Sequence, residues 1–359
     1  KLRFQEDYMV AGITSFIIIV LCIYLLTIIT DELFIESLDE IAKTLQLPSN
    51  VAGASLMAMG SSMPELSIAL IALVQEGGSH SDIGVGNIVG SAVFNILVIT
   101  GASALVRPAR VTGQVVMRDC MMYSMSIGLL LFTFLDGQIT IFESLSFLLL
   151  YAIYIAILFR WNRLFPGQDI DEELLEEEED HDKTILQKIY SGIATVLRLL
   201  TGPPRQAYVR AFIVSVFLIA AISWVLVEYA VILAEALGVP AILVALTILA
   251  GGSSVPDLIS SVLVAKKGRG EAAVSNAIGS NIFDISVGLG LPWLLVLLFQ
   301  QGTIIVGTED LLASTYVLLG TVVILFIFLT TDRTLSRREG AILLVLYVIY
   351  VFWAWLTAV

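Results

Sequence analysis

The sequence predicts an all-α integral membrane protein with ten transmembrane helices. The chain has 359 residues, of which 58% are hydrophobic and only 14% are charged, whereas soluble domains carry about 25% charged residues. The apolar residues form long continuous runs, which excludes the alternating strands of a transmembrane β-barrel. Composition and run length together place most of the chain inside a lipid bilayer.

Ten segments approach the roughly 20 apolar residues that a helix needs to cross a bilayer. In chain order they are residues 8–30, 51–75, 83–105, 121–135, 140–159, 208–236, 241–265, 272–299, 311–330 and 340–358. The first five spans form an N-terminal half within residues 1–165. The last five form a C-terminal half within residues 208–359.

Residues 166–207 separate the two halves and differ from both in composition. They begin with the acidic run 169–182, which repels itself and is typical of a solvated linker, and which lacks the central glycine of an EF-hand loop. The following stretch, 184–205, is basic and partly amphipathic, as in helices that lie on a membrane surface. A second acidic cluster, 31–39, follows the first span. Neither acidic stretch is expected to form a buried ion site.

The distribution of Lys and Arg predicts the orientation in the membrane. These residues occur in the connections after the first, third, fifth, seventh and ninth spans, and the other four connections contain none. By the positive-inside rule, both termini are extracytoplasmic and the linker 166–207 is cytoplasmic. Lys1 and Arg3 alone oppose this assignment. We expect a multi-pass protein of a plasma or inner membrane, and no cleavable signal sequence is visible.

Two similar segments place an acid, a proline and two serines inside apolar spans. They read Gly-Ser-Ser-Met-Pro-Glu at 60–65 and Gly-Ser-Ser-Val-Pro-Asp at 252–257. The copies lie in the second and seventh spans, an odd number of crossings apart, so they run through the membrane in opposite directions. The sequence therefore predicts inverted-topology repeats at about 51–105 and 241–299, with a ligand site near the midplane at their interface.

The alignment of the two repeats has no gaps in two blocks. Residues 56–67 match 248–259, and residues 85–101 match 274–290. Pro64 and Pro256 cannot donate a hydrogen bond to the carbonyl four residues back. We therefore expect both proline-containing spans to be broken helices with free backbone oxygens, which are tolerated at membrane depth only inside protein or a wet cavity.

Oxygen-bearing side chains gather around each motif. The serines before each acid stand three and four residues away, so their hydroxyls are expected to share its helix face. The adjacent spans carry polar side chains at a spacing of four, which aims them along one line. The predicted ligands are Glu65, Asp257, Asp284, Asn95, Ser61, Ser62, Ser91, Ser253, Ser254, Ser280, Asn87 and Asn276.

Carboxylate, amide, hydroxyl and carbonyl oxygens are the ligands that hard cations such as Ca²⁺ and Na⁺ prefer, and the lack of His and Cys among them disfavours Zn, Cu and Fe. Hydrogen bonding between helices explains Asn87 and Asn276 equally well. Glu228 and Glu235 fit either a solvated helix end or an ion passage. We expect no enzyme, cofactor or nucleic-acid partner, because no nucleophile, metal triad or cofactor fingerprint occurs. The expected partners are inorganic cations and the bilayer, and no partner protein is predicted.

The two motifs, with their neighbours at 86–95 and 275–284, resemble the α-repeats of the cation/Ca²⁺ exchanger superfamily. The resemblance implies secondary active antiport, in which Na⁺ and Ca²⁺ alternately occupy a site formed by the second, third, seventh and eighth spans while the first and sixth move. It implies that Glu65 and Asp257 are the central Ca²⁺ ligands, aided by carbonyls near Ser61 and Ser253, and that Asn95 and Asp284 complete this cluster. The implied Na⁺ positions are lined by Ser62, Ser91, Ser254 and Ser280.

The resemblance leaves the coupled ions open. Asp257 together with Asp284 looks like the K⁺-dependent branch of the Na⁺/Ca²⁺ exchangers, although Asp284 also matches exchangers that need no K⁺. Proton-coupled members usually show Gly-Asn-x-x-Glu instead of the motif found here, so H⁺/Ca²⁺ exchange or exchange of another cation is the alternative. A cation channel is a further alternative, because acidic rings and broken helices also serve channels.

Overall fold

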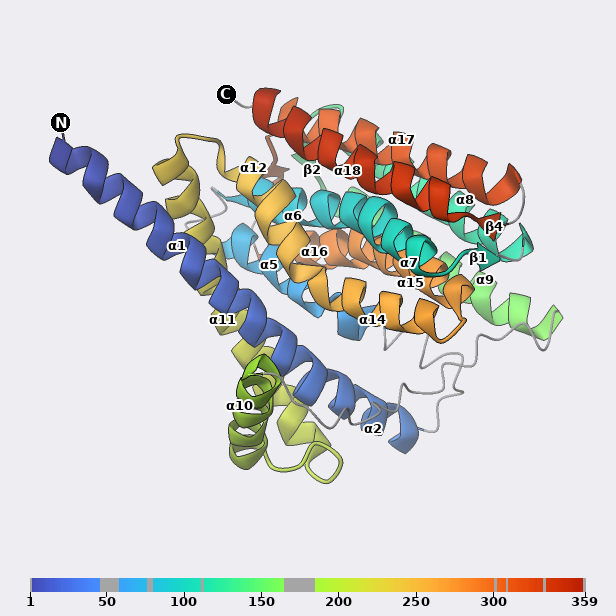
Figure 1. Ribbon diagram of the computed structural model, residues 1–359, viewed down its shortest axis with the longest axis horizontal. Coiled ribbons are helices and arrows are strands. Elements are labelled where there is room, and N and C mark those ends of the chain that lie inside the picture. Colours follow the sequence, from blue (N-terminus) through green and yellow to red (C-terminus); the bar gives the residue numbers. More distant parts are fainter. Residues whose placement is uncertain are drawn as a thin grey trace.

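The computed structural model describes residues 2–45, 58–75, 80–110, 113–164, 185–299, 302–307, 309–331 and 334–357. This part of the chain is almost entirely helical (Figure 1). Helices cover the described residues of nearly all the predicted spans. The first seven residues of the second span and the acidic run 169–182 lie outside the described residues.

The elements are labelled as in Figure 1, and η denotes a π-helical turn. The N-terminal half contains α1 (Leu2–Ile29), η1 (Thr30–Ile35), α2 (Glu36–Thr44), α4 (Ala58–Ser61), α5 (Met63–Val74), α6 (Ser81–Phe94), η4 (Asn95–Ile99), α7 (Thr100–Val106), β1 (Ala109–Arg110), α8 (Gly113–Thr133), β2 (Gln138–Ile139) and α9 (Ile141–Leu164). The linker contains α10 (Ile185–Thr201).

The C-terminal half contains α11 (Tyr208–Leu237), α12 (Ala241–Val244), η5 (Ala245–Leu249), α13 (Ala250–Ser253), α14 (Val255–Lys266), α15 (Gly270–Phe283), η6 (Asp284–Leu289), α16 (Gly290–Phe299), β3 (Ile304–Ile305), α17 (Glu309–Thr331), β4 (Thr334–Leu335) and α18 (Arg337–Thr357).

Seven helical segments of the described chain are long and apolar enough to cross a membrane. An eighth is obtained if α12 to α14, which bend by 43° at a short break, form one span. The shorter helix α5 is also apolar. The chain is therefore an all-α multi-pass membrane protein, and the full plan of ten spans stays a prediction.

The first span does not end where the sequence predicts. The helix continues from α1 through η1 and α2 to Thr44, so the acidic cluster 31–39 and Lys43 lie on a helix. The physical reason is that this continuation is amphipathic: Leu33, Phe34 and Leu38 are buried, whereas Asp31 is exposed. The acidic residues 31–39 therefore lie along a helix that continues past the predicted span, and they do not mark the end of that helix.

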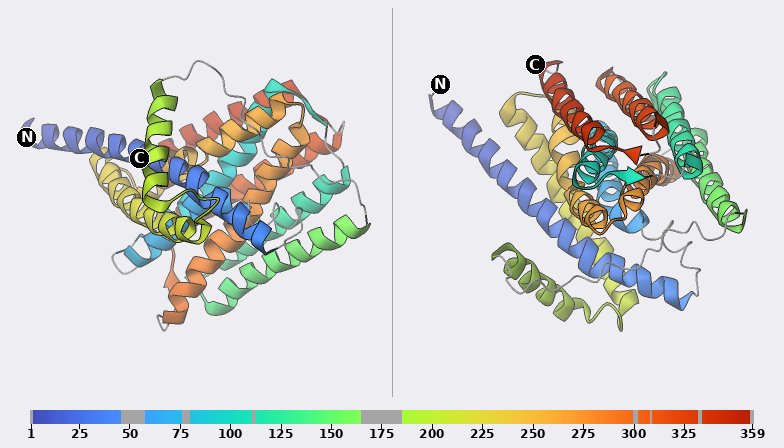
Figure 2. Two further views of the ribbon diagram at one scale, coloured as in Figure 1. Left: turned by 90° about the horizontal axis from the view of Figure 1, so that it is seen from below. Right: turned by 45° about the vertical axis from the view of Figure 1, so that its right-hand side comes forward.

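The long helices α1 and α11 run side by side along one flank of the bundle (Figures 1 and 2). Their buried residues form one apolar cluster with α5 and η5. A second, larger cluster lies among α6, α8, α9, α15, α16 and α17. The motif helices α5 and α13 contact α11 and α1, respectively, on one side and α6 on the other, whereas α14 packs on α7 and α15.

Two small antiparallel sheets join the two halves of the chain. β1 pairs with β4, which connects the segment after α7 to the segment after α17. β2 pairs with β3, which connects the segment after α8 to the segment after α16. Each sheet thus combines one connection from each half, and together they fix the halves against each other.

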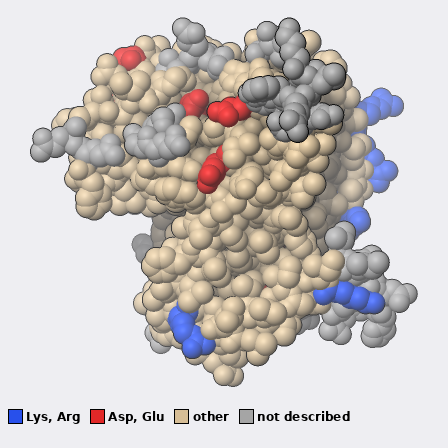
Figure 3. Space-filling model, turned by 90° about the vertical axis from the view of Figure 1, so that its left-hand side faces the viewer, with Lys and Arg blue, Asp and Glu red and all other residues tan. Residues whose placement is uncertain are grey.

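The linker helix α10 packs beside α1 and α11. The guanidinium of Arg198 contacts Glu32 at 2.5 Å and Glu36 at 3.0 Å, so the linker is bonded to the continuation of the first span. Figure 3 views the molecule from the side where the N-terminus of α1 lies; the described part of this face is mostly uncharged, with a few Asp and Glu side chains in its upper part and Lys and Arg at its edges.

Candidate cation site

Both motif helices are interrupted, as their prolines predict. The first breaks at Ser62, between α4 and α5, and the second at Ser254, between α13 and α14. In each case Pro occupies the start of the second helix, where its missing N–H is tolerated. The breaks place Glu65 and Asp257 in the first turn of α5 and α14, where the positive end of the helix dipole stabilises a carboxylate.

The three predicted acidic ligands lie on separate elements but within electrostatic range of one another. Among the described residues, no group of three His, Cys, Asp or Glu side chains is by itself arranged to hold one metal ion, so neutral oxygens would have to complete a site here. Glu65 and Asp284 are 3% and 1% exposed, and Asp257 is half-buried. Asp257 interacts electrostatically with Glu65, and Asp284 interacts with both. Three mutually repelling carboxylates inside an apolar bundle are costly unless cations or protons neutralise them.

The serines contact the acid of the opposite motif copy. The Glu65 carboxylate interacts with Ser253, and the Asp284 carboxylate interacts with Ser62. Ser91 and Ser254 share a hydrogen bond between their Oγ atoms at 2.8 Å. The sequence predicted that the serines of each motif share a helix face with the acid of the same motif. This expectation is incomplete, because each helix breaks at its second serine and the serines contact acids of the other repeat. Side chains of the two copies thus interact within one cluster.

The neighbouring helices contribute their polar residues at the start of a π-helical turn. η4 begins at Asn95 and η6 begins at Asp284, which are equivalent residues of the two repeats. Short π-helical turns within α-helices frequently occur at functional sites, because they redirect a side chain locally. The four-residue spacing of the polar side chains carries no signal of these turns.

Asn281 is a site residue that the sequence reasoning missed. It is fully buried on α15, and its amide bonds Asn95 Nδ2 at 2.8 Å, the Ala92 carbonyl at 3.1 Å and the Tyr123 hydroxyl at 2.9 Å. Its equivalent in the first repeat is Ala92, so a comparison of the repeats does not mark it. The feature of the sequence that could have indicated it is a polar side chain within an apolar span, three residues before Asp284.

Several buried oxygens of this cluster have no hydrogen-bond partner among the described residues. They are Glu65 Oε2, Asn95 Oδ1 and Asp284 Oδ1. Unpartnered buried acceptors are rare in native proteins and require a ligand, ion or water. Because all three are oxygens and two belong to carboxylates, the arrangement fits a hard cation.

Asn87 and Asn276, which are equivalent in the two repeats, lie in different surroundings. Asn87 is fully buried, and neither atom of its amide has a partner in the described part of the chain. Asn276 is exposed. Within the part of the chain that the structure describes, neither forms the hydrogen bond between helices that would give it a purely structural role. The remaining predicted ligands, Ser61 and Ser280, are half-buried and buried.

Glu228 and Glu235, for which the sequence left two roles open, are both exposed on α11. The structure does not bring them into the cluster described above.

The sequence matches the model of the family described as "Sodium/calcium exchanger protein" over residues 14–160 and 208–356. The chain belongs to this exchanger family. The match includes both motif copies and leaves out the linker. Because the family consists of transporters, this exchanger is a transporter and not an enzyme.

Curated relatives cover most of the exchanger. It is 29% identical to human "Sodium/potassium/calcium exchanger 5" over 93% of this chain and 81% of the relative. It is 30% identical to "Putative antiporter CaxA" of Alkalimonas amylolytica over 93% of this chain and 96% of the relative. At these identities the names of the relatives do not fix the coupling ion of this chain.

Two solved structures share the fold of the exchanger. The H⁺/Ca²⁺ exchanger CAX superposes with a TM-score of 0.67 at 16% identity, covering 96% of this chain and 82% of that structure. The sodium-calcium exchanger NCX_Mj superposes with a TM-score of 0.55 at 22% identity, covering 95% and 97%. At these identities the likeness concerns the fold alone.

Proposed function

We propose that the chain is a secondary active antiporter that exchanges Na⁺ for Ca²⁺ across a membrane by alternating access. The observation that carries this proposal is the cluster of Glu65 and Asp284, both buried, with the half-buried Asp257. It draws on both repeats, and one carboxylate oxygen each of Glu65 and Asp284 has no hydrogen-bond partner among the described residues. The family match and the names of the sodium/potassium/calcium exchangers support Ca²⁺ and Na⁺ as its ions.

Charge balance explains why such a site would exchange ions and not leak them. The three carboxylates carry at most three negative charges. Three Na⁺, one Ca²⁺ with a monovalent cation, or one Ca²⁺ with a protonated carboxyl would neutralise them. The empty site would bury repelling charges in an apolar bundle. The conformational switch is therefore favourable only when the site is loaded, which makes exchange obligatory.

The ligand assignment follows from this proposal. Glu65 and Asp257 hold Ca²⁺ with Asn95 and Asp284, aided by carbonyls near Ser61 and Ser253. The hydroxyls that line the Na⁺ positions belong to Ser62, Ser91, Ser254 and Ser280. Asn87 and Asn276 extend the oxygen-lined path toward the two sides of the membrane.

The proposed architecture is two five-helix repeats of inverted topology, at residues 1–165 and 208–359, with a linker at 166–207. The sheets support it, because one joins connections predicted to be cytoplasmic (β1 with β4) and the other joins connections predicted to be external (β2 with β3). Both termini would then be extracytoplasmic and the linker cytoplasmic.

We infer that the described conformation is open toward the cytoplasm. Residues of α5 are buried along most of its length, whereas Val255, Ile259 and Leu263 of α14 are exposed. Asn276, on the cytoplasmic side of Ser280 in the inferred topology, is exposed, and Asn87, on the external side of Ser91, is buried. An inward-open transporter is expected to show this pattern.

Uptake of ⁴⁵Ca²⁺ into proteoliposomes tests the proposed exchange. Gradients of Na⁺, K⁺ and H⁺ are imposed one at a time, with protein-free liposomes as the control. We expect uptake when Na⁺ is inside and Ca²⁺ outside. Uptake driven by H⁺ alone would favour H⁺/Ca²⁺ exchange, and Ca²⁺ flux without any counter-ion would favour a channel.

The K⁺-dependent form of this function depends on Asp284. If K⁺ travels with Ca²⁺, wild-type uptake requires external K⁺, and Asp284→Asn relaxes that requirement because one negative charge fewer needs neutralising. The measurement is the K⁺ dependence of ⁴⁵Ca²⁺ uptake in both proteins. Equal wild-type uptake with and without K⁺ would remove K⁺ from the proposal while leaving Na⁺/Ca²⁺ exchange intact.

A further inference from the structure

We infer that Asn281 is a positioning residue that turns the side-chain oxygen of Asn95 toward the bound cation. Asn281 lies beside the proposed ligand Ser280 and three residues before Asp284, but its own amide is used by other partners. The inference rests on the proposed cation site and deepens it by explaining how one of its neutral ligands is oriented.

The orientation follows from a chain of donors and acceptors that begins at a backbone carbonyl. The Ala92 oxygen has no proton to donate, so the Asn281 atom 3.1 Å away must be its nitrogen, Nδ2. The oxygen of Asn281 then lies on the other edge of the amide, 2.8 Å from Asn95. Since an oxygen needs a donor, the Asn95 atom that meets it must be Nδ2.

The second proton of Asn95 Nδ2 also faces α15. Its partner is Ser280 Oγ at 3.5 Å, and that hydroxyl in turn donates to the Ala277 carbonyl at 3.3 Å. Both hydrogen bonds that Asn95 Nδ2 donates are thus made to residues of the second repeat. Asn95 Oδ1, on the opposite edge, is buried and has no partner in the described structure.

This orientation matters because an asparagine has two chemically opposite edges. Turned by 180°, Asn95 would present an N–H₂ group to the cation and repel it. The Ala92 carbonyl, acting through Asn281, opposes that turn. The continuous helix formed by α6 and η4 therefore supplies both the proposed ligand Asn95 and, about one turn earlier, the carbonyl of Ala92 that sets its orientation.

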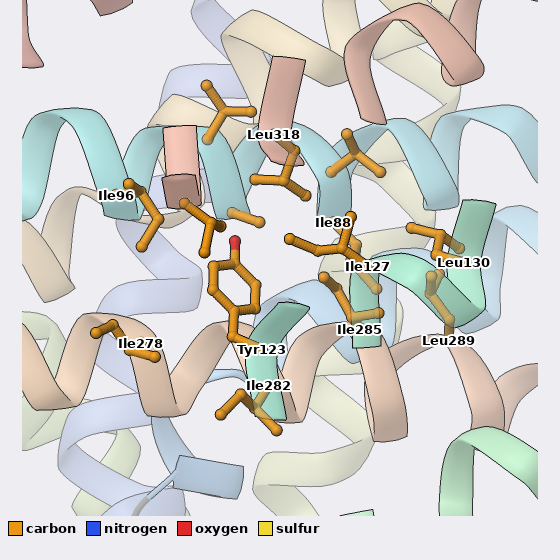
Figure 4. Packing of buried hydrophobic residues seen from close by; sticks show 14 of the residues in the cluster. Ile88, Ile96, Tyr123, Ile127, Leu130, Ile278, Ile282, Ile285, Leu289 and Leu318 are labelled. Atoms are coloured by element: carbon orange, nitrogen blue, oxygen red, sulfur yellow. The ribbon is translucent and has the colours of Figure 1, made fainter. Parts of the chain in front are cut away.

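Tyr123 supports Asn281 from α8 without setting the polarity. Its hydroxyl lies 2.9 Å from Asn281 Nδ2, and its fully buried ring packs among Ile96, Ile278 and Ile282 (Figure 4). A phenol can donate or accept, so it would tolerate either orientation of the amide. Tyr123→Phe is therefore a matched control that removes one buried hydrogen bond of Asn281 and keeps the two that orient Asn95.

Calorimetric titration of the purified full-length chain with Ca²⁺, in Na⁺-free detergent buffer, tests the inference. Asn281→Ala should weaken Ca²⁺ binding by about tenfold or more, because the interaction of a cation with an oriented dipole is lost. Tyr123→Phe should change it by less than about threefold, and so should Ser126→Ala, which removes a buried Oγ–Oγ hydrogen bond of 3.3 Å between α8 and η6. If Asn281→Ala fails to fold, Asn281→Leu fills the same volume.

The decisive comparison uses Asn95→Ala as a background. If Asn281 acts through Asn95, the double variant Asn95→Ala/Asn281→Ala binds Ca²⁺ as weakly as Asn95→Ala alone. Wild-type affinity in Asn281→Ala, or an equal loss with and without Asn95, would overturn the inference. A wild-type chain that binds no Ca²⁺ would instead contradict the proposed function, before any variant is compared.

Discussion

The two motif copies have nearly the same sequence but opposite surroundings. In the first copy, α11 packs along α5 and buries Glu65 together with most of the helix. In the second copy, α1 contacts the motif at α13, Gly252 lies against Ile23, and α14 keeps an exposed face with a half-buried Asp257. Two motifs of nearly the same sequence thus differ in burial, and they also differ in which long flanking helix they contact.

The hydrogen bonds across the interface differ between the copies as well. Asn281 of the second copy bonds Asn95, whereas its equivalent in the first copy is Ala92, which offers only a carbonyl. Asn95 of the first copy is equivalent to Asp284 of the second, so a neutral side chain in one copy corresponds to an acid in the other. The repeats are thus symmetric in backbone plan and asymmetric in charge, as a site for ions of different charge requires.

The largest expected effect comes from removing the charge of either motif acid. Glu65→Gln and Asp257→Asn should each reduce ⁴⁵Ca²⁺ uptake to the level of protein-free liposomes, because each acid is part of a single shared cluster. Glu235→Gln, on the exposed surface of α11, is the matched control and should retain uptake. Full uptake by either motif variant would show that the copies do not form one site.

Equivalent glycines of the two copies should differ in stability when replaced by alanine. A Cβ on Gly90 would lie 2.3 Å from the Leu246 carbonyl oxygen, so α6 and η5 would have to separate, at a cost of about 1–3 kcal/mol. A Cβ on Gly279 would meet only the Tyr154 hydroxyl within 4.0 Å.

Thermal unfolding in detergent measures this difference. Gly90→Ala should lower the melting temperature, and Gly279→Ala should leave it close to wild type. Equal melting temperatures would show that the tight crossing of α6 over η5 is not needed for the fold.

The accessibility of the two equivalent asparagines gives a milder test. In a background of Cys22→Ser and Cys120→Ser, which replaces two buried cysteines, Asn276→Cys should react with a polar maleimide much faster than Asn87→Cys. The reason is that Asn276 is exposed and Asn87 is buried. Equal reaction rates without added ions would contradict the difference in openness between the copies.

The sequence predicted much of this site because its signals are strong within an apolar chain. An acid, a proline and two serines in a membrane span, repeated once, were enough to predict the broken helices and the cluster of Glu65, Asp257 and Asp284. Most span boundaries also agree with the helices within about five residues. The exceptions are the first helix, whose amphipathic continuation to Thr44 was interpreted as a connection, and α8, which begins at Gly113 and not near residue 121.

What the sequence could not supply depends on contacts between distant segments. Asn281 is held by hydrogen bonds to a carbonyl and a hydroxyl on other helices. When the two repeats are aligned, its equivalent is Ala92, so the alignment does not mark it as polar in both copies. The π-helical turns at Asn95 and Asp284 leave no spacing signature. The exposure of Asn276 beside the burial of Asn87 belongs to one conformation, and equivalent sequence positions cannot predict it.

Competition between Na⁺ and Ca²⁺ tests the central claim most directly, namely that both motif copies form one site that the two ions occupy in turn. Ca²⁺ binding to the purified chain is titrated by calorimetry at increasing Na⁺, with choline at the same ionic strength as the control. The account predicts that the apparent affinity for Ca²⁺ falls steeply with Na⁺, since several Na⁺ are needed to replace one Ca²⁺. An affinity for Ca²⁺ that is the same in Na⁺ and in choline would contradict it.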